Sequence, residues 1–249
     1  MIIIKNNKEI DLMRSAGRIV AETLQLVEEK VRPGITTAEI DMIAEEFITK
    51  HGAKPSFKGL YGFPASLCIS VNEQVVHGIP GGYVLKDGDI VSVDCGAYLN
   101  GFHGDAARTF AVGNVSEEAN KLIKVTEQSF FKGIEYAKIG NRLTDISHGI
   151  QSYIEASGFS VVRDFVGHGI GRVVHEDPDV PNFGKPGRGP KLAQGMALAI
   201  EPMVNLGNYK VKTLNDDWTV VTSDGSLSAH YENTIVILPD GPEILTLIK

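Results

Sequence analysis

Acidic side chains stand at the ends of several apolar, β-branched segments of this 249-residue chain. Asp94 ends the run GDIVSVD, Glu201 ends GMALAIE, and Glu232 precedes the apolar run NTIVIL. A carboxylate in such a position is costly to bury unless a positive charge compensates it. A divalent cation would supply that charge, so these segments suggest a metal site.

The dipeptide Asn100-Gly101 lies between two segments of β character and is typical of a two-residue hairpin turn. Such a turn would pair Asp94 with Ala107 and leave Asp105 diagonally across on the same face of the sheet. Diagonal neighbours are about 7 to 8 Å apart at the backbone, which allows two carboxylates to hold one cation from either side. The hairpin alone leaves an alternative open, in which both aspartates are simply exposed.

His168, in the segment FVGHGIG, completes the set of candidate ligands. Its flanking glycines would leave the ring open to a ligand. The segment is not a phosphate-binding loop, because it lacks the GK[ST] ending. The alternative is that His168 is a turn residue and binds no ligand. Four carboxylates and one imidazole suit two divalent ions better than one. Oxygen-rich ligation favours Mn²⁺, Fe²⁺ or Co²⁺, with Zn²⁺ as an alternative. A pair of such ions about 3.5 to 4 Å apart would activate water for hydrolysis.

Two further histidines occur in a repeated motif, VVHGIP at 75–80 and VVHEDP at 173–178. Other blocks recur in the same order. The glycine-to-glycine segments 34–52 and 140–158 match at an offset of 106, and GDIVSVD matches GMALAIE at an offset of 107. This period is too long for a solenoid repeat. The pattern predicts one domain over 1–249 with an internal duplication, its lobes spanning about 1–113 and 114–249.

Each half of the sequence opens with two helical segments. Apolar spacing predicts a helix over 7–31, and Thr36 with Glu39 predicts a capping box at the start of the next; helices near 116–137 and 142–156 follow in the second half. Segments of β character then occur at 66–71, 89–99, 102–112, 160–166, 196–204, 219–225 and 232–238. Helices followed by hairpins, twice, predict an α+β fold with antiparallel pairing. The proline- and glycine-rich stretch 176–195 is expected to be irregular, either a surface connection or a loop that borders the site.

Composition restricts the class of protein. The formal charge of −7 and the pI of about 5.5 argue against a surface that binds phosphate backbones. The first residues, MIII, are too few for a signal-peptide core, and we find no apolar run of about 18 residues that would span a membrane. We therefore expect a soluble cytoplasmic protein, by default a monomer. Cys68 and Cys95 are too few for a disulfide framework and are expected to be buried thiols.

Five motifs, in order, resemble those of the type I (bacterial-type) methionine aminopeptidases: HGIP, VDCGAYLNGFHGDAARTF, GHGIGRVVHEDP, AIEP and YENTIVI. The resemblance covers essentially the whole chain. It implies the pita-bread fold around a dinuclear metal site. It also implies removal of the initiator methionine from nascent proteins and peptides whose second residue is small, by attack of a metal-bridging water or hydroxide.

The resemblance implies a role for each candidate ligand. Asp94 would chelate one metal ion, and Asp105 and Glu232 would bridge both ions. His168 and Glu201 would bind the other ion, and Glu201 would also act as the general base.

Two catalytic histidines and a substrate pocket are implied in the same way. His175 would hydrogen-bond the scissile carbonyl, and His77 would position the peptide and assist proton transfer. The substrate would contact Phe63, Cys68, His77, His175 and Trp218, of which Trp218 could instead be core filler. Phe63 and Val174 differ from the residues that some members have at these positions. We expect both differences to alter the shape of the pocket without altering the chemistry.

Three other readings stay open. An X-Pro aminopeptidase, prolidase or creatinase would use similar ligands, but its additional N-terminal domain is not expected, because the first helix begins within ten residues of Met1. A non-catalytic binding module would be expected to lack at least one ligand. A metal-dependent phosphoesterase would need a basic cradle that this acidic chain lacks. For a methionine aminopeptidase, the partners would be nascent N-terminal peptides and transiently the ribosome, for which no motif stands out.

Overall fold

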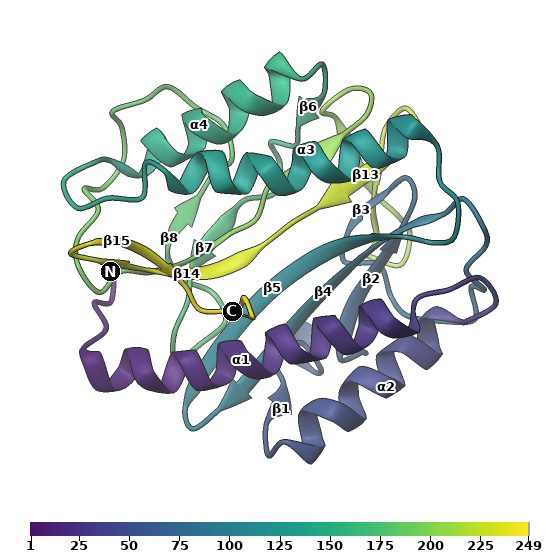
Figure 1. The fold of residues 1–249 in the computed structure, drawn as a ribbon, viewed down its shortest axis with the longest axis horizontal. Coiled ribbons are helices and arrows are strands. Elements are labelled where there is room, and N and C mark those ends of the chain that lie inside the picture. Colours follow the sequence, from purple (N-terminus) through teal and green to yellow (C-terminus); the bar gives the residue numbers. More distant parts are fainter. Residues whose placement is uncertain (249) are drawn as a thin grey trace.

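Two pairs of helices enclose the strands of this protein (Figure 1), whose computed structural model describes residues 1–248. The helices are α1 (Asn7–Lys30), α2 (Thr37–Lys50), α3 (Glu117–Ile134) and α4 (Leu143–Ala156). All four predicted helices are present, and Thr36 and Glu39 form the predicted capping box. None of the described helices is both long and apolar enough to cross a membrane.

Strands fill the space between the helix pairs. In the first half they are β1 (Lys54–Pro55), β2 (Leu67–Val71), β3 (Gln74–Val76), β4 (Ile90–Leu99) and β5 (Phe102–Ala111), with the short helix η1 (Leu60–Gly62). In the second half they are β6 (Ser160–Val161), β7 (Gly167–Gly169), β8 (Glu176–Val180), β9 (Ala197–Ile200), β10 (Met203–Asn205), β11 (Val211–Thr213), β12 (Val220–Thr222), β13 (Ser228–His230), β14 (Asn233–Leu238) and β15 (Gly241–Ile244).

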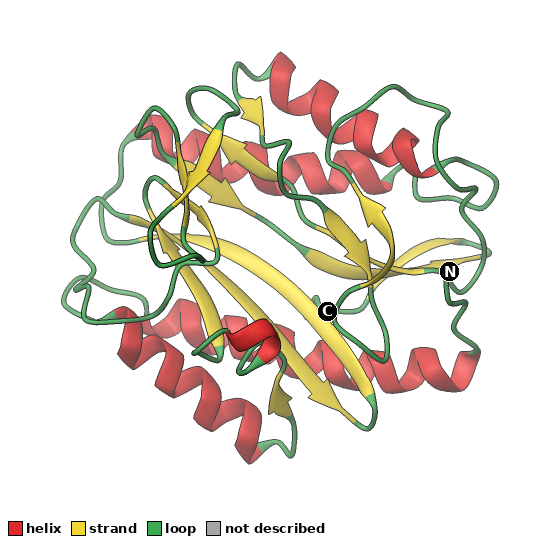
Figure 2. Cartoon of the chain, turned by 180° about the vertical axis from the view of Figure 1, so that it is seen from behind, coloured by secondary structure: helices red, strands yellow, loops and turns green. Residues whose placement is uncertain are grey.

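Two sheets carry most of the site. In the first, β4 pairs with β1, β2 and β5, and the second has the order β15-β14-β9-β7-β8. Smaller sheets join β13-β10-β6 and β11-β12-β3. Pairing between the strands of residues 1–248 is antiparallel throughout, so the predicted α+β class is confirmed. Seen from behind (Figure 2), the sheets face the viewer and η1 lies on this open face.

The hairpin of β4 and β5 has the register that its turn residues predict. Asn100 and Gly101 both have positive φ, 51° and 88°, as a two-residue turn of this kind requires. Asp94 pairs with Ala107, and Asp105 pairs with Gly96. The two aspartates therefore lie on one face of the hairpin.

Two predicted β segments, and one segment predicted to be irregular, differ from expectation. The segment 160–166 is a strand only at Ser160–Val161. The segment 196–204 is interrupted at Glu201 and Pro202, where proline has no N–H to give to a ladder. The expectation that 176–195 is irregular is wrong for its first five residues, because Glu176–Val180 forms β8. Since β8 is at the edge of its sheet, it can contain Pro178 and exposed acidic residues.

Each helix pair covers its own apolar core. Residues of α1 and α2 pack with β2 and β4, and residues of α3 and α4 pack with β9 and β14. The helices α2 and α4 both have 14 residues, and α4 begins at Leu143, 106 positions after α2 begins at Thr37. This spacing equals the offset of the sequence repeat, while the internal duplication itself stays a prediction. Cys68 and Cys95 are free, buried thiols, as expected.

Candidate metal centre

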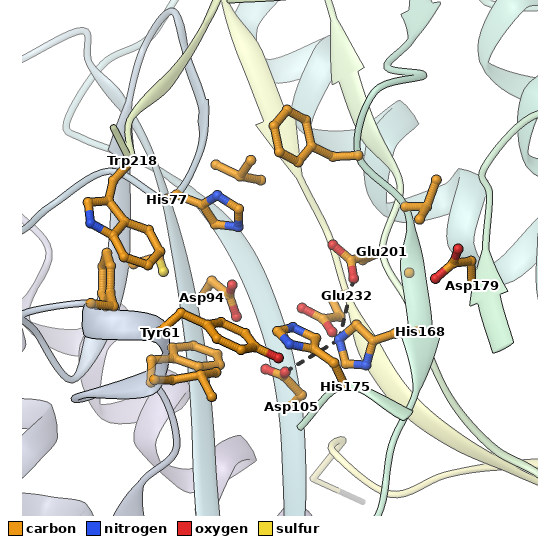
Figure 3. Close-up of a pocket in the computed structure, with 18 of the residues that line it drawn as sticks. Tyr61, His77, Asp94, Asp105, His168, His175, Asp179, Glu201, Trp218 and Glu232 are labelled. Carbon is orange, nitrogen blue, oxygen red and sulfur yellow. Dashed lines mark ion pairs between the residues drawn. The ribbon is translucent and has the colours of Figure 1, made fainter. Parts of the chain in front are cut away.

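Residues from both halves of the chain line a cavity of about 560 Å³ (Figure 3). Its walls include Asp94 from β4 and Asp105 from β5, and from the other half His168 in β7, Glu201 after β9 and Glu232 before β14. The structure thus brings together the five predicted ligands, which come from five separate segments. Asp105 is only 3% exposed, which excludes the reading of it as an exposed hairpin aspartate.

The side chains of this cluster are spaced as donors around a shared cation would be. His168 Nε2 lies 3.8 Å from Asp105 Oδ2 and 3.6 Å from Glu201 Oε1. Asp105, His168 and Glu232 each offer one ligand atom within 4.8 Å of the others. These separations exceed hydrogen-bond lengths. Two donors bound to one ion at about 2.0 to 2.2 Å each would be separated by such a distance.

Burial and mutual repulsion dominate the electrostatics of the carboxylates. Burial raises the pKa of Asp94 to about 7. Burial also raises the pKa of Asp105 well above its usual value, and the charges of Asp94 and Glu201 raise it further. The pKa values of Glu201 and Glu232 are raised for the same two reasons. Nearby positive charge, such as that of Arg108 near Glu232, does not offset this repulsion.

A hydrogen bond to the backbone orients the ring of His168. Its Nδ1 lies 2.8 Å from the carbonyl oxygen of Gly169, so Nδ1–H donates there and Nε2 faces the carboxylates. Burial lowers its pKa to about 4. Glycine is required on both sides of His168 by packing, and not by access of a ligand as expected. A Cβ at Gly167 would collide with the backbone of Ala199, and a Cβ at Gly169 with the backbone of Asp177. Glycine lets β7 fit between its two neighbouring strands.

The repeated motif places a histidine on each side of the cavity (Figure 3). His175 is beside the ligands, its ring centroid 4.5 Å from that of His168. His77 is on the side of Trp218, with the two ring centroids 6.4 Å apart. Burial lowers the pKa of both rings, that of His77 to about 4. Both rings are therefore neutral near pH 7, and each can donate or accept a proton.

An apolar wall adjoins the carboxylates. Phe57, Phe63, Ala65, Cys68 and Val174 form a buried cluster against which Leu60, Ile79 and Trp218 pack. Phe63 and Trp218 meet edge to face at 5.0 Å, and Phe63, Cys68 and Trp218 all line the cavity. Trp218 is thus not only core filler. Such a wall beside a polar cluster fits a substrate with one apolar side chain next to the bond that reacts.

Comparison with known proteins identifies the family. The model of metallopeptidase family M24 matches residues 11–239. A methionine aminopeptidase of Clostridium perfringens is 78% identical over 249 residues, all of both chains. The chain belongs to the methionine aminopeptidases of family M24. Another relative, methionine aminopeptidase 1 of Bacillus subtilis, is 58% identical and also matches along its full length.

Solved structures of methionine aminopeptidases have the same fold. The Thermotoga maritima enzyme superimposes with a TM-score of 0.98 at 48% identity, and the Rickettsia prowazekii enzyme with 0.98 at 46%. The coverage is 100% of both chains for the first, and 99% of this chain and 100% of the other for the second. An Xaa-Pro dipeptidase of Bacillus anthracis, 24% identical with a TM-score of 0.80, shares the fold over 62% of its own length. The predicted pita-bread fold is confirmed.

The cluster fits the metal that family M24 requires. Asp94 Oδ1, Asp105 Oδ1 and Glu232 Oε1 are buried and accept no hydrogen bond from any described residue. Buried carboxylate oxygens without a donor are costly unless a cation binds them. Oxygen donors with an imidazole suit Mn²⁺, Fe²⁺, Co²⁺ or Zn²⁺. This methionine aminopeptidase therefore has the donor set of a metallopeptidase.

Several residues in or beside the cavity were not found from the sequence. Tyr61 stacks over His175 with ring centroids 5.9 Å apart, and Asp179 lies opposite His168 in the ladder of β7 and β8. His230 is buried beside Glu201 and Glu232. In the sequence HYE, His230 is two positions before Glu232, and the two-residue period of extended chain could have placed both side chains on one face.

Proposed function

We propose that this methionine aminopeptidase removes the N-terminal methionine from nascent proteins and peptides whose second residue is small. The observation that carries the proposal is that the ligand cluster and the apolar wall line the same cavity. A methionine side chain is flexible and polarizable and packs well on aromatic rings and a thiol. Phe63, Cys68 and Trp218 would hold it while its amide carbon lies near the carboxylates. The preference for a small second residue rests on the sequence resemblance.

The proposed cofactor is a pair of divalent ions, Mn²⁺, Fe²⁺, Co²⁺ or Zn²⁺. Asp94 would bind one ion, His168 and Glu201 the other, and Asp105 and Glu232 both. When bound, such ions lower the pKa of coordinated water and polarise the scissile carbonyl. Four carboxylates balance the charge of two divalent ions, which supports two ions rather than one.

The protein's own groups would move the protons and hold the peptide. Glu201 would accept a proton from water on a carboxylate oxygen and return it to the leaving amine. Neutral His175, at the edge of the ligand cluster, would donate a hydrogen bond to the scissile carbonyl. His77, on the opposite wall beside Trp218, would orient the peptide and assist the proton transfers.

The wider setting belongs to the same proposal. We expect a single domain built from two duplicated lobes, about 1–113 and 114–249, that acts as a monomer in the cytoplasm. Because the substrates are nascent chains, a transient contact with the ribosome is part of the proposal. The acidic charge supports the expectation that it binds no specific nucleic acid.

Peptide hydrolysis tests the function directly. Chelator-treated protein would be assayed with Met-Ala-Ser and Ala-Pro-Ser before and after addition of Mn²⁺, Co²⁺, Fe²⁺ or Zn²⁺. We expect metal-dependent release of methionine, and no cleavage of the second peptide. Cleavage before proline would instead favour the X-Pro peptidases, which share this fold. No cleavage with any ion would contradict an enzymatic role.

A further inference from the structure

His230, the last residue of β13, is held firmly beside the ligand cluster. It is 2% exposed. Its backbone N–H donates to Thr109 Oγ1 at 2.9 Å, and the same hydroxyl donates to the carbonyl oxygen of His230 at 2.8 Å. Thr109 belongs to β5, the strand that carries Asp105. The backbone of His230 is therefore fixed to the same strand as a predicted metal ligand.

The side chain of His230 faces two carboxylates. Its Nε2 lies 3.7 Å from Glu201 Oε2 and 4.0 Å from Glu232 Oε2. Glu201 thus has an imidazole on each side, because its other oxygen, Oε1, lies 3.6 Å from Nε2 of His168. His230 Nε2 is buried and has no hydrogen-bond partner among the described residues. A buried polar atom of this kind is expected to have a role.

The imidazoles of His168 and His230 differ in their position relative to the cavity. His168 lines the cavity, together with Glu201 and Glu232, whereas His230 is not among the described residues that line it. Ala229 and Tyr231 pack into the core with residues of α3, so the side chains of His230 and Glu232 lie on the other face of this segment. The acceptors nearest to Nε2 of His230 are carboxylate oxygens, which favours the tautomer with the hydrogen on Nε2.

We infer that His230 is a positioning residue, whose Nε2–H is directed at Oε2 of Glu201 and holds that carboxylate with Oε1 turned to His168. The final torsion of a glutamate side chain is soft, so closing the gap from 3.7 Å to a hydrogen bond requires only a small rotation. Hydrogen bonds to a metal-ligating carboxylate orient it and tune its affinity. The inference rests on the proposed function in assigning Glu201 as a ligand and base.

Two substitutions separate this role from simple packing. His230→Leu removes the donor at similar size, and His230→Gln keeps an N–H donor. Calorimetric titration of the metal-free proteins with Mn²⁺ would measure affinity without substrate. We expect H230L to bind Mn²⁺ about 10- to 100-fold more weakly than the wild type, the usual effect of losing such a partner. H230Q should retain most of the wild-type affinity for Mn²⁺. The matched control, His148→Leu at an exposed position of α4, should bind as the wild type does.

The kinetic counterpart uses Met-Ala-Ser at saturating metal. We expect H230L to lower kcat while KM stays within about 2-fold, because the lost contact orients Glu201 rather than the peptide. Wild-type affinity and kcat in H230L would overturn the inference. Equal loss in H230L and H230Q would also overturn it, because the imidazole itself would then be needed.

A measurement on the wild-type protein avoids any folding defect of the variants. In the Co²⁺-loaded enzyme, a metal-bound imidazole gives a strongly shifted, exchangeable N–H resonance. We expect one such resonance, from His168. A second such resonance in the wild type would show that another histidine, such as His230, binds the metal, and would overturn the positioning role. The metal-affinity measurement does not depend on turnover. If the wild type released no methionine, the proposed function would be wrong, but the comparison of metal affinities would still test the role of His230.

Discussion

His168 Nε2 lies 3.8 Å from Asp105 Oδ2, although the two residues belong to different sheets and to different halves of the sequence. Neither sheet holds the cluster alone. An ion bound there would join β5 to β7, and with them the two helix pairs that cover these sheets. Metal binding is therefore expected to affect the stability of the whole molecule as well as its activity.

Metal removal should destabilise the protein more at high pH than at low pH. In the metal-free state, burial raises the pKa of Asp94 from 3.8 to about 7. An acid whose pKa is raised on folding favours the folded state below its unfolded pKa, and this contribution is lost as pH rises through the folded value. Stability of the metal-free protein should thus fall between about pH 4 and pH 7, while bound metal holds the ionised form. Scanning calorimetry at about pH 5 and pH 8, with and without chelator, would measure the difference in Tm.

An equal gain in Tm from metal at both pH values would contradict this account. The control is Asp94→Asn, which removes the titrating group of β4 at nearly constant size. Its metal-free form should lose less stability than the metal-free wild type as pH rises.

Glu201→Gln should lower turnover by about 100-fold or more, because it removes a base and a ligand charge together. Methionine release at saturating metal would measure kcat, and metal content after dialysis would report the lost charge. Asp164→Asn, an exposed acid at the same cavity, is the control and should leave turnover largely unchanged. Near-normal turnover of E201Q would remove Glu201 from the mechanism.

His175→Ala should lower kcat much more than it weakens metal binding. The ring centroid of His175 lies 4.5 Å from that of His168. Its proposed partner is the oxygen of the scissile carbonyl, and this hydrogen bond would strengthen as negative charge develops on that oxygen in the transition state. Kinetics with Met-Ala-Ser, beside calorimetry with Mn²⁺, would separate the two effects. If weaker metal binding accounts for the whole loss of kcat, His175 has a structural role instead.

Trp218→Ala should reduce kcat/KM for a methionine peptide by about 10-fold, the equivalent of roughly 1.4 kcal/mol of lost apolar contact. The ring meets Phe63 edge to face at the apolar wall, away from the carboxylates. Metal affinity should therefore not change. Trp218→Phe keeps an aromatic surface and should retain most of the activity. Unchanged kcat/KM in W218A would place the methionine side chain elsewhere.

Local features of the fold could be predicted from the sequence because their causes are local. Thr36 and Glu39 are three residues apart, and their capping box needs no other part of the chain. Asn100 and Gly101 adopt positive φ readily, so the turn sets the register that pairs Asp94 with Ala107. These short-range rules were enough to place two acids on one face of a hairpin.

Features that depend on neighbours distant in the sequence could not be predicted in this way. Glu176–Val180 contains proline and acidic residues, and it is a strand because β7 gives it a partner at the edge of a sheet. The glycines beside His168 are required by the backbones of Ala199 and Asp177, which only the assembled sheet brings close. Local conformational propensity does not predict such long-range contacts.

The sequence by itself determined the family, the helix pairs, the β4–β5 register and the kinds of side chain that could bind metal. Only the tertiary structure decided that Asp105, His168 and Glu201 meet in one cavity beside Phe63 and Trp218, and that His230 lies beside Glu201. The reason is physical. Residue type and spacing fix local conformation, whereas the distance between two sheets depends on how both cores pack, and that packing sets which buried charges face one another.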